Sequence, residues 1–204
     1  MLGGGSMSDE RHTHLAAAEA TLGKAPGHAV AHMMLGYLQI HTNRAAQGIA
    51  ECERALVLDR NLATAHAIIG QGKYYSGRAE ETEAHIEEAF RLSPRDSLAF
   101  TWQFLVGTAK LQLGRDEEAV QWPRRAIEGN RNFSIVHFFL ASALAFVGRR
   151  DQAQAAVEAG LSVDPAFTIR RFHANAVAAS DDPTFLAQRE RIIEGMRKAG
   201  VPEG

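Results

Sequence analysis

Residues 63–94 read ATAHAIIGQGKYYSGRAEETEAHIEEAFRLSP. Apolar residues in the first part of this stretch recur every three to four positions, which is the spacing of one face of an α-helix. Gly77 predicts the end of this helix, because glycine tolerates the left-handed backbone found at helix C-termini. A second helix is expected over residues 79–92, with Glu80 and Glu81 in its first turn and Pro94 just beyond its end. The stretch therefore predicts two helices joined by a tight turn.

The same pattern returns along the chain at a nearly constant step. Equivalent residues in three registers are separated by 34, 37 and 34 positions. These registers are Gly36, Gly70, Gly107 and Ala141; Asn43, Gly77, Gly114 and Gly148; and Ala55, Ala89, Ala126 and Gly160. A fourth register holds Pro26, Arg60, Pro94, Arg131 and Pro165. Repeats of about 20 to 50 residues are typical of solenoids, and the step of 37 indicates three extra residues between Asp96 and Phe100.

No stretch alternates apolar and polar residues as a half-buried strand does, so we expect an all-α chain of antiparallel helix pairs. The glycine-rich residues 1–8 are expected to be an expression scar or flexible linker. Residues 9–23, followed by Pro26, fit only the second helix of a unit, so we expect a half-repeat over residues 9–28. Its missing first helix is expected to lie in a longer parent chain, or its open face to be covered by something else. Four full units follow at residues 29–62, 63–96, 97–133 and 134–167.

Residues 168–204 are expected to form a closing segment with a C-terminal capping helix. The stretch Ser180-Asp-Asp-Pro-Thr-Phe supplies a capping residue and a first-turn proline. An apolar face follows at Phe185, Ile192, Met196 and Ala199.

The 34-residue unit resembles the tetratricopeptide repeat. Gly70, Gly77, Ala89 and Pro94 stand where that family has a small residue at the helix crossing, the turn glycine, a small residue in the second helix and the final proline. The sequence departs from the family in three ways. Histidine replaces the early aromatic residue at His32, His66 and His137; arginine replaces the proline at Arg60 and Arg131; and Pro123 lies within a second helix. The resemblance covers residues 9–167 and implies a right-handed α-solenoid.

The C-terminal sequence resembles the end of the repeat regions that follow the catalytic domain in bacterial class III adenylate or guanylate cyclases. The stretches are VDPAFTIR at 163–170, DPTF at 182–185 and IEGMRKAGVPE at 193–203. The catalytic aspartates and strands of the cyclases have no counterpart in this sequence. The resemblance therefore implies a regulatory fragment of a signalling protein that makes no cyclic nucleotide itself.

Composition excludes several classes of protein. Lys and Arg number 22 against 24 Asp and Glu, and no lobe is basic, so nucleic-acid binding is not expected. No apolar run is long enough to span a membrane. The single cysteine, Cys52, cannot form an internal disulfide and is expected in the core, which favours a reducing, cytoplasmic location.

We expect no catalytic residue, metal ion or cofactor. His28 and His32 are four positions apart, as two metal ligands on a helix would be, but the alternative of hydrogen-bonded or solvent-facing histidines is favoured. His32, His66 and His137 are expected to fill equivalent packing positions in successive units. The glutamate pairs lie in first turns or on solvated faces, where the helix dipole accounts for them.

The resemblance implies that first helices line a concave groove. The candidate groove residues are Met33, Tyr37, Ile40, His41, Tyr74, Tyr75, Phe104, Leu111, Phe138 and Phe146. Aromatic and methionine side chains anchor many protein interfaces, although packing between helices is the alternative for about half of this set. The expected function is a non-enzymatic module that binds an apolar protein segment. The alternative is a scaffold that self-associates through the half-repeat.

Overall fold

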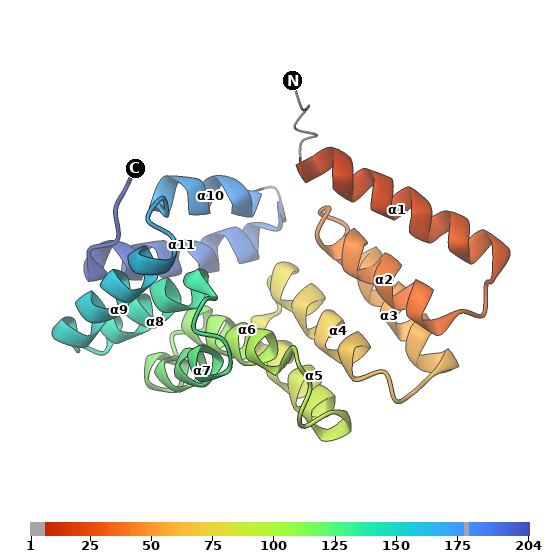
Figure 1. Ribbon diagram of the computed structural model, residues 1–204, viewed down its shortest axis with the longest axis horizontal. Helices are drawn as coiled ribbons and strands as arrows, with labels where there is room; N and C mark the ends of the chain where they lie inside the picture. Colours follow the sequence, from red (N-terminus) through yellow and green to blue (C-terminus); the bar gives the residue numbers. More distant parts are fainter. Residues whose placement is uncertain (1–6, 178–179) are drawn as a thin grey trace.

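The computed structural model describes residues 7–177 and 180–204, and this part of the chain forms eleven α-helices (Figure 1). The helices are α1 Met7–Lys24, α2 Ala29–Ile40, α3 Ala45–Leu58, α4 Ala63–Tyr75, α5 Ala79–Leu92, α6 Ala99–Gln112, α7 Asp116–Gly129, α8 Ser134–Phe146, α9 Arg150–Val163, α10 Ile169–Val177 and α11 Pro183–Ala199. The all-α prediction is confirmed. No helix among the described residues combines the length and the apolar character needed to cross a membrane.

Helices α2 to α9 pack as four successive pairs, α2 with α3, α4 with α5, α6 with α7 and α8 with α9. Each second helix also contacts the first helix of the next pair, so the pairs stack into a curved array (Figure 1). Each pair buries its apolar faces against its neighbours, as repeat proteins do.

The turn within each pair requires a left-handed backbone. Asn43, Gly77, Gly114 and Gly148 have φ angles of 59°, 69°, 73° and 76°. Asparagine can replace glycine in the first turn because it is one of the few other residues that adopt this conformation readily. This requirement explains why the register recurs in the sequence.

The small residues at the helix crossings allow close backbone approach. A Cβ atom at Gly36 would lie 2.5 Å from the sulfur of Cys52 and 2.6 Å from the carbonyl oxygen of Gly48. A Cβ atom at Gly107 would lie 2.8 Å from Cδ of Pro123. The proline within α7 is thus accommodated where α6 has no side chain, and α7 continues through it to Gly129.

The N-terminal helix α1 begins at Met7, inside the segment 1–8 expected to be a linker, and residues 1–6 lie outside the described part of the chain. Leu15 of α1 packs with Leu35 and Leu38 of α2. Between residues 13 and 24 the exposed positions of α1 hold alanine, glycine and polar or charged side chains, and no large apolar one. These described positions therefore give no support to self-association through an apolar face of the half-repeat.

The C-terminal helices lie along the array. Helices α10 and α11 pack against each other, and α11 begins near the end of α4 and runs past α6 to α8 (Figure 1). The hydroxyl of Ser180 donates to the carbonyl of Tyr75 at 2.7 Å, and the hydroxyl of Ser142 donates to the carbonyl of Ile192 at 3.0 Å. The predicted helix is present, and it extends well beyond the last pair.

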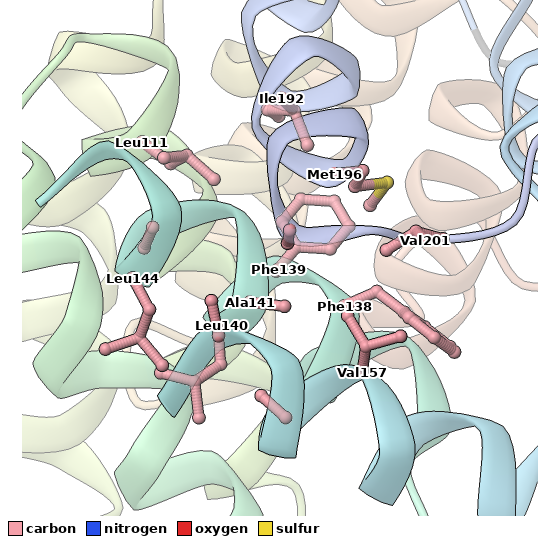
Figure 2. Close-up of a cluster of buried hydrophobic side chains, with 14 of the residues drawn as sticks. Leu111, Phe138, Phe139, Leu140, Ala141, Leu144, Val157, Ile192, Met196 and Val201 are labelled. Atoms are coloured by element: carbon pink, nitrogen blue, oxygen red, sulfur yellow. The ribbon is translucent and has the colours of Figure 1, made fainter. Parts of the chain in front are cut away.

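The start of α11 is capped as expected. Asp182 Oδ1 accepts a hydrogen bond from the backbone nitrogen of Phe185 at 2.9 Å, and Pro183 occupies the first turn. The apolar face of the helix enters the core, where Ile192 and Met196 are fully buried beside α8 and Val201 (Figure 2). Buried apolar area of this kind holds α11 in place.

Candidate ligand-binding groove

One face of the first helices forms a stripe that recurs in every pair. Its positions are spaced by four, three and four residues, so they share one helix face. We define the inner stripe as Val30, Met34 and Tyr37 of α2 with His41 at its C-cap; Thr64, Ile68, Gln71 and Tyr75 of α4; Thr101, Leu105, Thr108 and Gln112 of α6; and Ile135, Phe139, Ser142 and Phe146 of α8.

Most of the inner stripe lines a cavity of about 690 Å³. Its remaining walls are Phe172 of α10 and Arg189 of α11, together with neighbours of the stripe such as Trp102. No residue within α1, α3, α5, α7 or α9 is among the described residues that line it. The cavity volume lies within the range typical of small-molecule sites.

The two ends of the cavity differ. At the α2 end Val30, Met34 and Tyr37 remain 44%, 45% and 39% exposed, so an apolar edge is open to solvent. At the other end two side chains of α11 cover the stripe residue Phe146. The guanidinium carbon of Arg191 lies 3.9 Å from the centre of the Phe146 ring, and Nζ of Lys198 lies 4.7 Å from it. The groove is therefore shortened by the chain's own C-terminal helix.

The structure brings half of the candidate groove residues into the cavity wall. These are Met33, Tyr37, Tyr74, Tyr75 and Phe104. Tyr74 is almost fully buried, and burial raises the pKa of its hydroxyl well above the ordinary value. Its role in binding stays a prediction.

The other five candidates do not line the cavity. Ile40, Leu111 and Phe138 have no exposed surface, because their side chains pack between helices. The Phe138 ring stacks on Phe167 with centroids 3.8 Å apart. Phe146 is covered by α11, as described above. His41 lies against Tyr37, with ring centroids 4.4 Å apart. These five candidates therefore lie outside the cavity wall.

Aromatic rings join the open edge of the cavity to α11. The ring centroid of His41 lies 5.8 Å from that of Tyr75. Those of Tyr74 and Tyr75 each lie 5.3 Å from that of Phe185 at the start of α11. These edge-to-face arrangements are favourable for aromatic pairs, so they fix where α11 begins on α4.

Arg189 places a positive charge in the cavity wall. The residue is 6% exposed, its Nη2 donates to the carbonyl of Phe172 at 2.5 Å, and its guanidinium carbon lies 4.0 Å from the ring centre of Phe172. Among the side chains that the structure describes, Nε of Arg189 has no hydrogen-bond partner and no carboxylate forms an ion pair with the residue. Burial lowers the pKa of this guanidinium, which nevertheless stays charged because its ordinary value is so high.

Sequence reasoning missed Arg189 because the surrounding stretch, AQRERIIEGMRK at 187–198, reads as a charged surface. A signal was nevertheless present. Arg189 follows Phe185 by four residues and precedes Ile192 and Met196 by three and seven, so it stands on the apolar face of its helix. A single charged residue on an apolar helix face is expected to be buried, and buried charged residues usually have a specific partner.

Two of the three recurrent histidines, His32 and His137, have hydrogen-bond partners, and so does His28. His32 shares a hydrogen bond of 2.6 Å with Glu51 and one of 2.9 Å with the carbonyl of Pro26. His137 makes the equivalent bond, at 3.1 Å, to the carbonyl of Arg131. His28 accepts from the backbone nitrogen of Ala31 at 3.1 Å. Within the described residues no group of three or more histidine, cysteine or acidic side chains is placed to hold a metal ion.

Cys52 is fully buried, as predicted. Burial, with smaller contributions from Glu51 and Glu53, raises the pKa of its thiol to about 12. A thiol with so little thiolate is a poor nucleophile, so the side chain acts as part of the core.

Comparison with known proteins supports the repeat assignment. A family model described as Tetratricopeptide repeat matches residues 15–63 and 69–134, which is more than half of the chain. No curated protein sequence matches.

Similar solved structures share the fold. One is YrrB, a TPR protein with an unusual peptide-binding site, with a TM-score of 0.61 and 20% identity over 89% of this chain and 93% of that one. A thermophilic TPR protein of Thermus thermophilus, TTC0263, has a TM-score of 0.64 and 16% identity over 81% and 88%. MamA has a TM-score of 0.63 and 16% identity over 80% and 97%. Such low identities are evidence for the fold alone.

Proposed function

Because the chain belongs to the tetratricopeptide repeat family, we propose that it is a non-catalytic module that binds a protein segment along the inner stripe. The observation that carries this proposal is the apolar edge at Val30, Met34 and Tyr37, which is exposed and continues directly into the cavity. Exposed apolar side chains that lie together are typical of protein-binding surfaces. Aromatic residues in the adjoining wall supply the anchoring pockets that such interfaces use.

An amphipathic helix is the segment that fits this groove best. The walls are themselves helices whose backbone groups are hydrogen-bonded within each helix, so they offer few partners to an extended peptide backbone. A helical segment satisfies its own backbone and presents only side chains to the groove. We therefore propose apolar side chains at a three-to-four spacing as the recognition element.

The proposal is tested with a displayed library of amphipathic helical peptides. Selected peptides are measured by fluorescence anisotropy against the unmodified chain and against Met34→Glu and Tyr37→Ala. We expect each variant to weaken binding by about tenfold or more, as hot-spot residues do. Val57→Ala is the matched control, because Val57 is 88% exposed on α3, outside the cavity wall. A library without binders, or equal loss in all three variants, contradicts the proposal.

We further propose that the chain is the regulatory part of a larger signalling protein such as a bacterial nucleotide cyclase. The support is the sequence resemblance of residues 163–170 and 193–203. These two segments meet in the structure, where Ile169 and Arg170 donate backbone hydrogen bonds to Pro202 and Glu203 at 2.9 and 3.0 Å. A cyclase domain encoded upstream in the same reading frame is expected, and a genomic sequence without one contradicts this proposal.

A further inference from the structure

The charge of Arg189 has no anion to balance it in the described structure. The whole residue is only 6% exposed, so its guanidinium has lost most of its hydration, and an unpaired buried charge is strongly unfavourable. The ring of Phe172 and one backbone carbonyl compensate only in part. The unpartnered Nε belongs to a side chain that lines the cavity. A ligand in the cavity that carries a negative charge would supply the missing partner.

The number of charges limits the chemistry of this ligand. Arg189 is the only Lys or Arg among the described residues that line the cavity, and none of those residues is acidic. One guanidinium balances one negative charge, and its planar donors match a carboxylate. A dianion such as a phosphate monoester would leave a second charge buried without a partner. A monocarboxylate is therefore the matching headgroup.

The rest of the cavity favours a hydrocarbon. Ile68, Leu105 and Phe139 represent its mainly apolar and aromatic wall. The hydroxyls of Thr101 and Thr108 already donate to the carbonyls of Leu98 and Phe104, at 2.6 and 2.8 Å. A peptide backbone buried here would lose hydrogen bonds to water without replacing them, whereas an alkyl chain has none to lose.

We propose that this cavity is a binding site for a small amphipathic monocarboxylate of the fatty-acid type, with its carboxylate on Arg189 and its alkyl chain along the inner stripe. This ligand is a small molecule that would lie on part of the same inner stripe, so the proposal goes beyond the recognition of a protein segment. The volume of about 690 Å³ is in the range of cavities that enclose such ligands.

The test compares dodecanoate with dodecan-1-ol, two probes that differ only in the headgroup. Isothermal titration calorimetry, below the concentration at which either probe self-associates, measures both affinities for the unmodified chain. Fluorescence of Trp102, which lines the cavity, reports occupancy in a Trp122→Phe background. We expect dodecanoate to bind about tenfold or more tighter, because a buried charge-assisted hydrogen bond is lost with the alcohol. Equal affinities, or no saturable binding of dodecanoate, overturn the proposal.

Variants locate the site. Arg189→Met should remove the preference for the carboxylate while the alcohol binds as before. Arg197→Met is the matched control, because Arg197 is exposed on the same helix and should keep the preference. Thr64→Phe narrows the cavity without changing charge and should weaken both probes by about tenfold. Unchanged dodecanoate affinity in Arg189→Met or in Thr64→Phe overturns the proposal, as does loss of the preference in Arg197→Met. No peptide is used, so this failure is distinct from failure of the groove proposal.

Discussion

Replacement of Gly195 by alanine should loosen the C-terminal helix from the array. A Cβ atom at this position of α11 would lie 1.9 Å from Oγ of Ser142, 2.9 Å from its Cβ and 2.7 Å from Cε2 of Phe146. Both residues belong to α8, so the helix as a whole must move to make room. The Ser142 hydroxyl also holds the carbonyl of Ile192 on the same helix as Gly195.

The expected change in the free energy of unfolding of Gly195→Ala is the sum of one stabilising and two destabilising effects. Glycine to alanine in a helix interior normally stabilises by about 1 kcal/mol. Overpacking of a tight contact costs about 1 to 3 kcal/mol, and loss of the Ser142 hydrogen bond costs about 1 kcal/mol more. We therefore expect a net loss of about 1 to 3 kcal/mol in the free energy of unfolding, measured by urea denaturation followed by circular dichroism.

Two further variants separate the steric clash at Gly195 from the higher helix propensity of alanine. Gly23→Ala is the control, because Gly23 is helical in α1 and a Cβ atom there meets nothing within 4 Å. It should leave stability unchanged or slightly raised. Combining Gly195→Ala with Ser142→Ala should recover part of the loss, because the closest clash is with the Ser142 hydroxyl. If Gly195→Ala alone is as stable as the unmodified chain, the packing of α11 on α8 is refuted.

Three further predictions concern the core, the turns and a histidine. Cys52 should react with a thiol reagent only in denaturant, because its thiol is buried with a pKa raised to about 12; rapid labelling of the folded chain would contradict its burial. Gly77→Ala should lower the thermal unfolding midpoint more than Gly148→Ala. Both glycines have positive φ, but only at Gly77 would a Cβ atom also clash with the start of α11, where it would lie 2.6 Å from Oδ1 of Asp182. Equal losses in thermal denaturation would argue against that contact. Burial lowers the pKa of His85 below its ordinary 6.5, so its contribution to stability is present above about pH 6.5 and is lost as pH falls through the lower folded-state value. His85→Gln should reduce the fall in the urea midpoint of unfolding as the pH is lowered. An unchanged fall would exclude His85 as its source.

The repeat units could be predicted because backbone geometry restricts the residues that carry them. Positive φ angles at the turns strongly favour glycine and a few other residues such as asparagine, as Gly77 and Asn43 show. Close crossings admit only small residues, as at Gly36. Both constraints are local, so they leave a periodic trace in the sequence. Helices α4 and α5 accordingly lie where the spacing placed them.

The binding site could be predicted only in part, because it depends on contacts between distant residues. The spacing of Tyr37 and Tyr75 indicates a helix face, but not which face turns inward. Leu111 and Phe138 are equally apolar and lie between helices. The path of α11 is set by contacts such as Ser180 with Tyr75, 105 positions apart. Arg189 enters the cavity wall only because α11 follows that path.

A crystal structure of the chain grown with dodecanoate would show both the path of α11 and the place where the ligand binds. In the structure α11 covers one end of the inner stripe and places the side chain of Arg189, without a carboxylate partner among the described residues, in the wall of an apolar cavity. We expect the dodecanoate carboxylate within hydrogen-bonding distance of the Arg189 guanidinium and the alkyl chain between α4, α6 and α8. A structure in which α11 lies away from α6 and α8, or in which the cavity is empty at saturating dodecanoate, would contradict this arrangement.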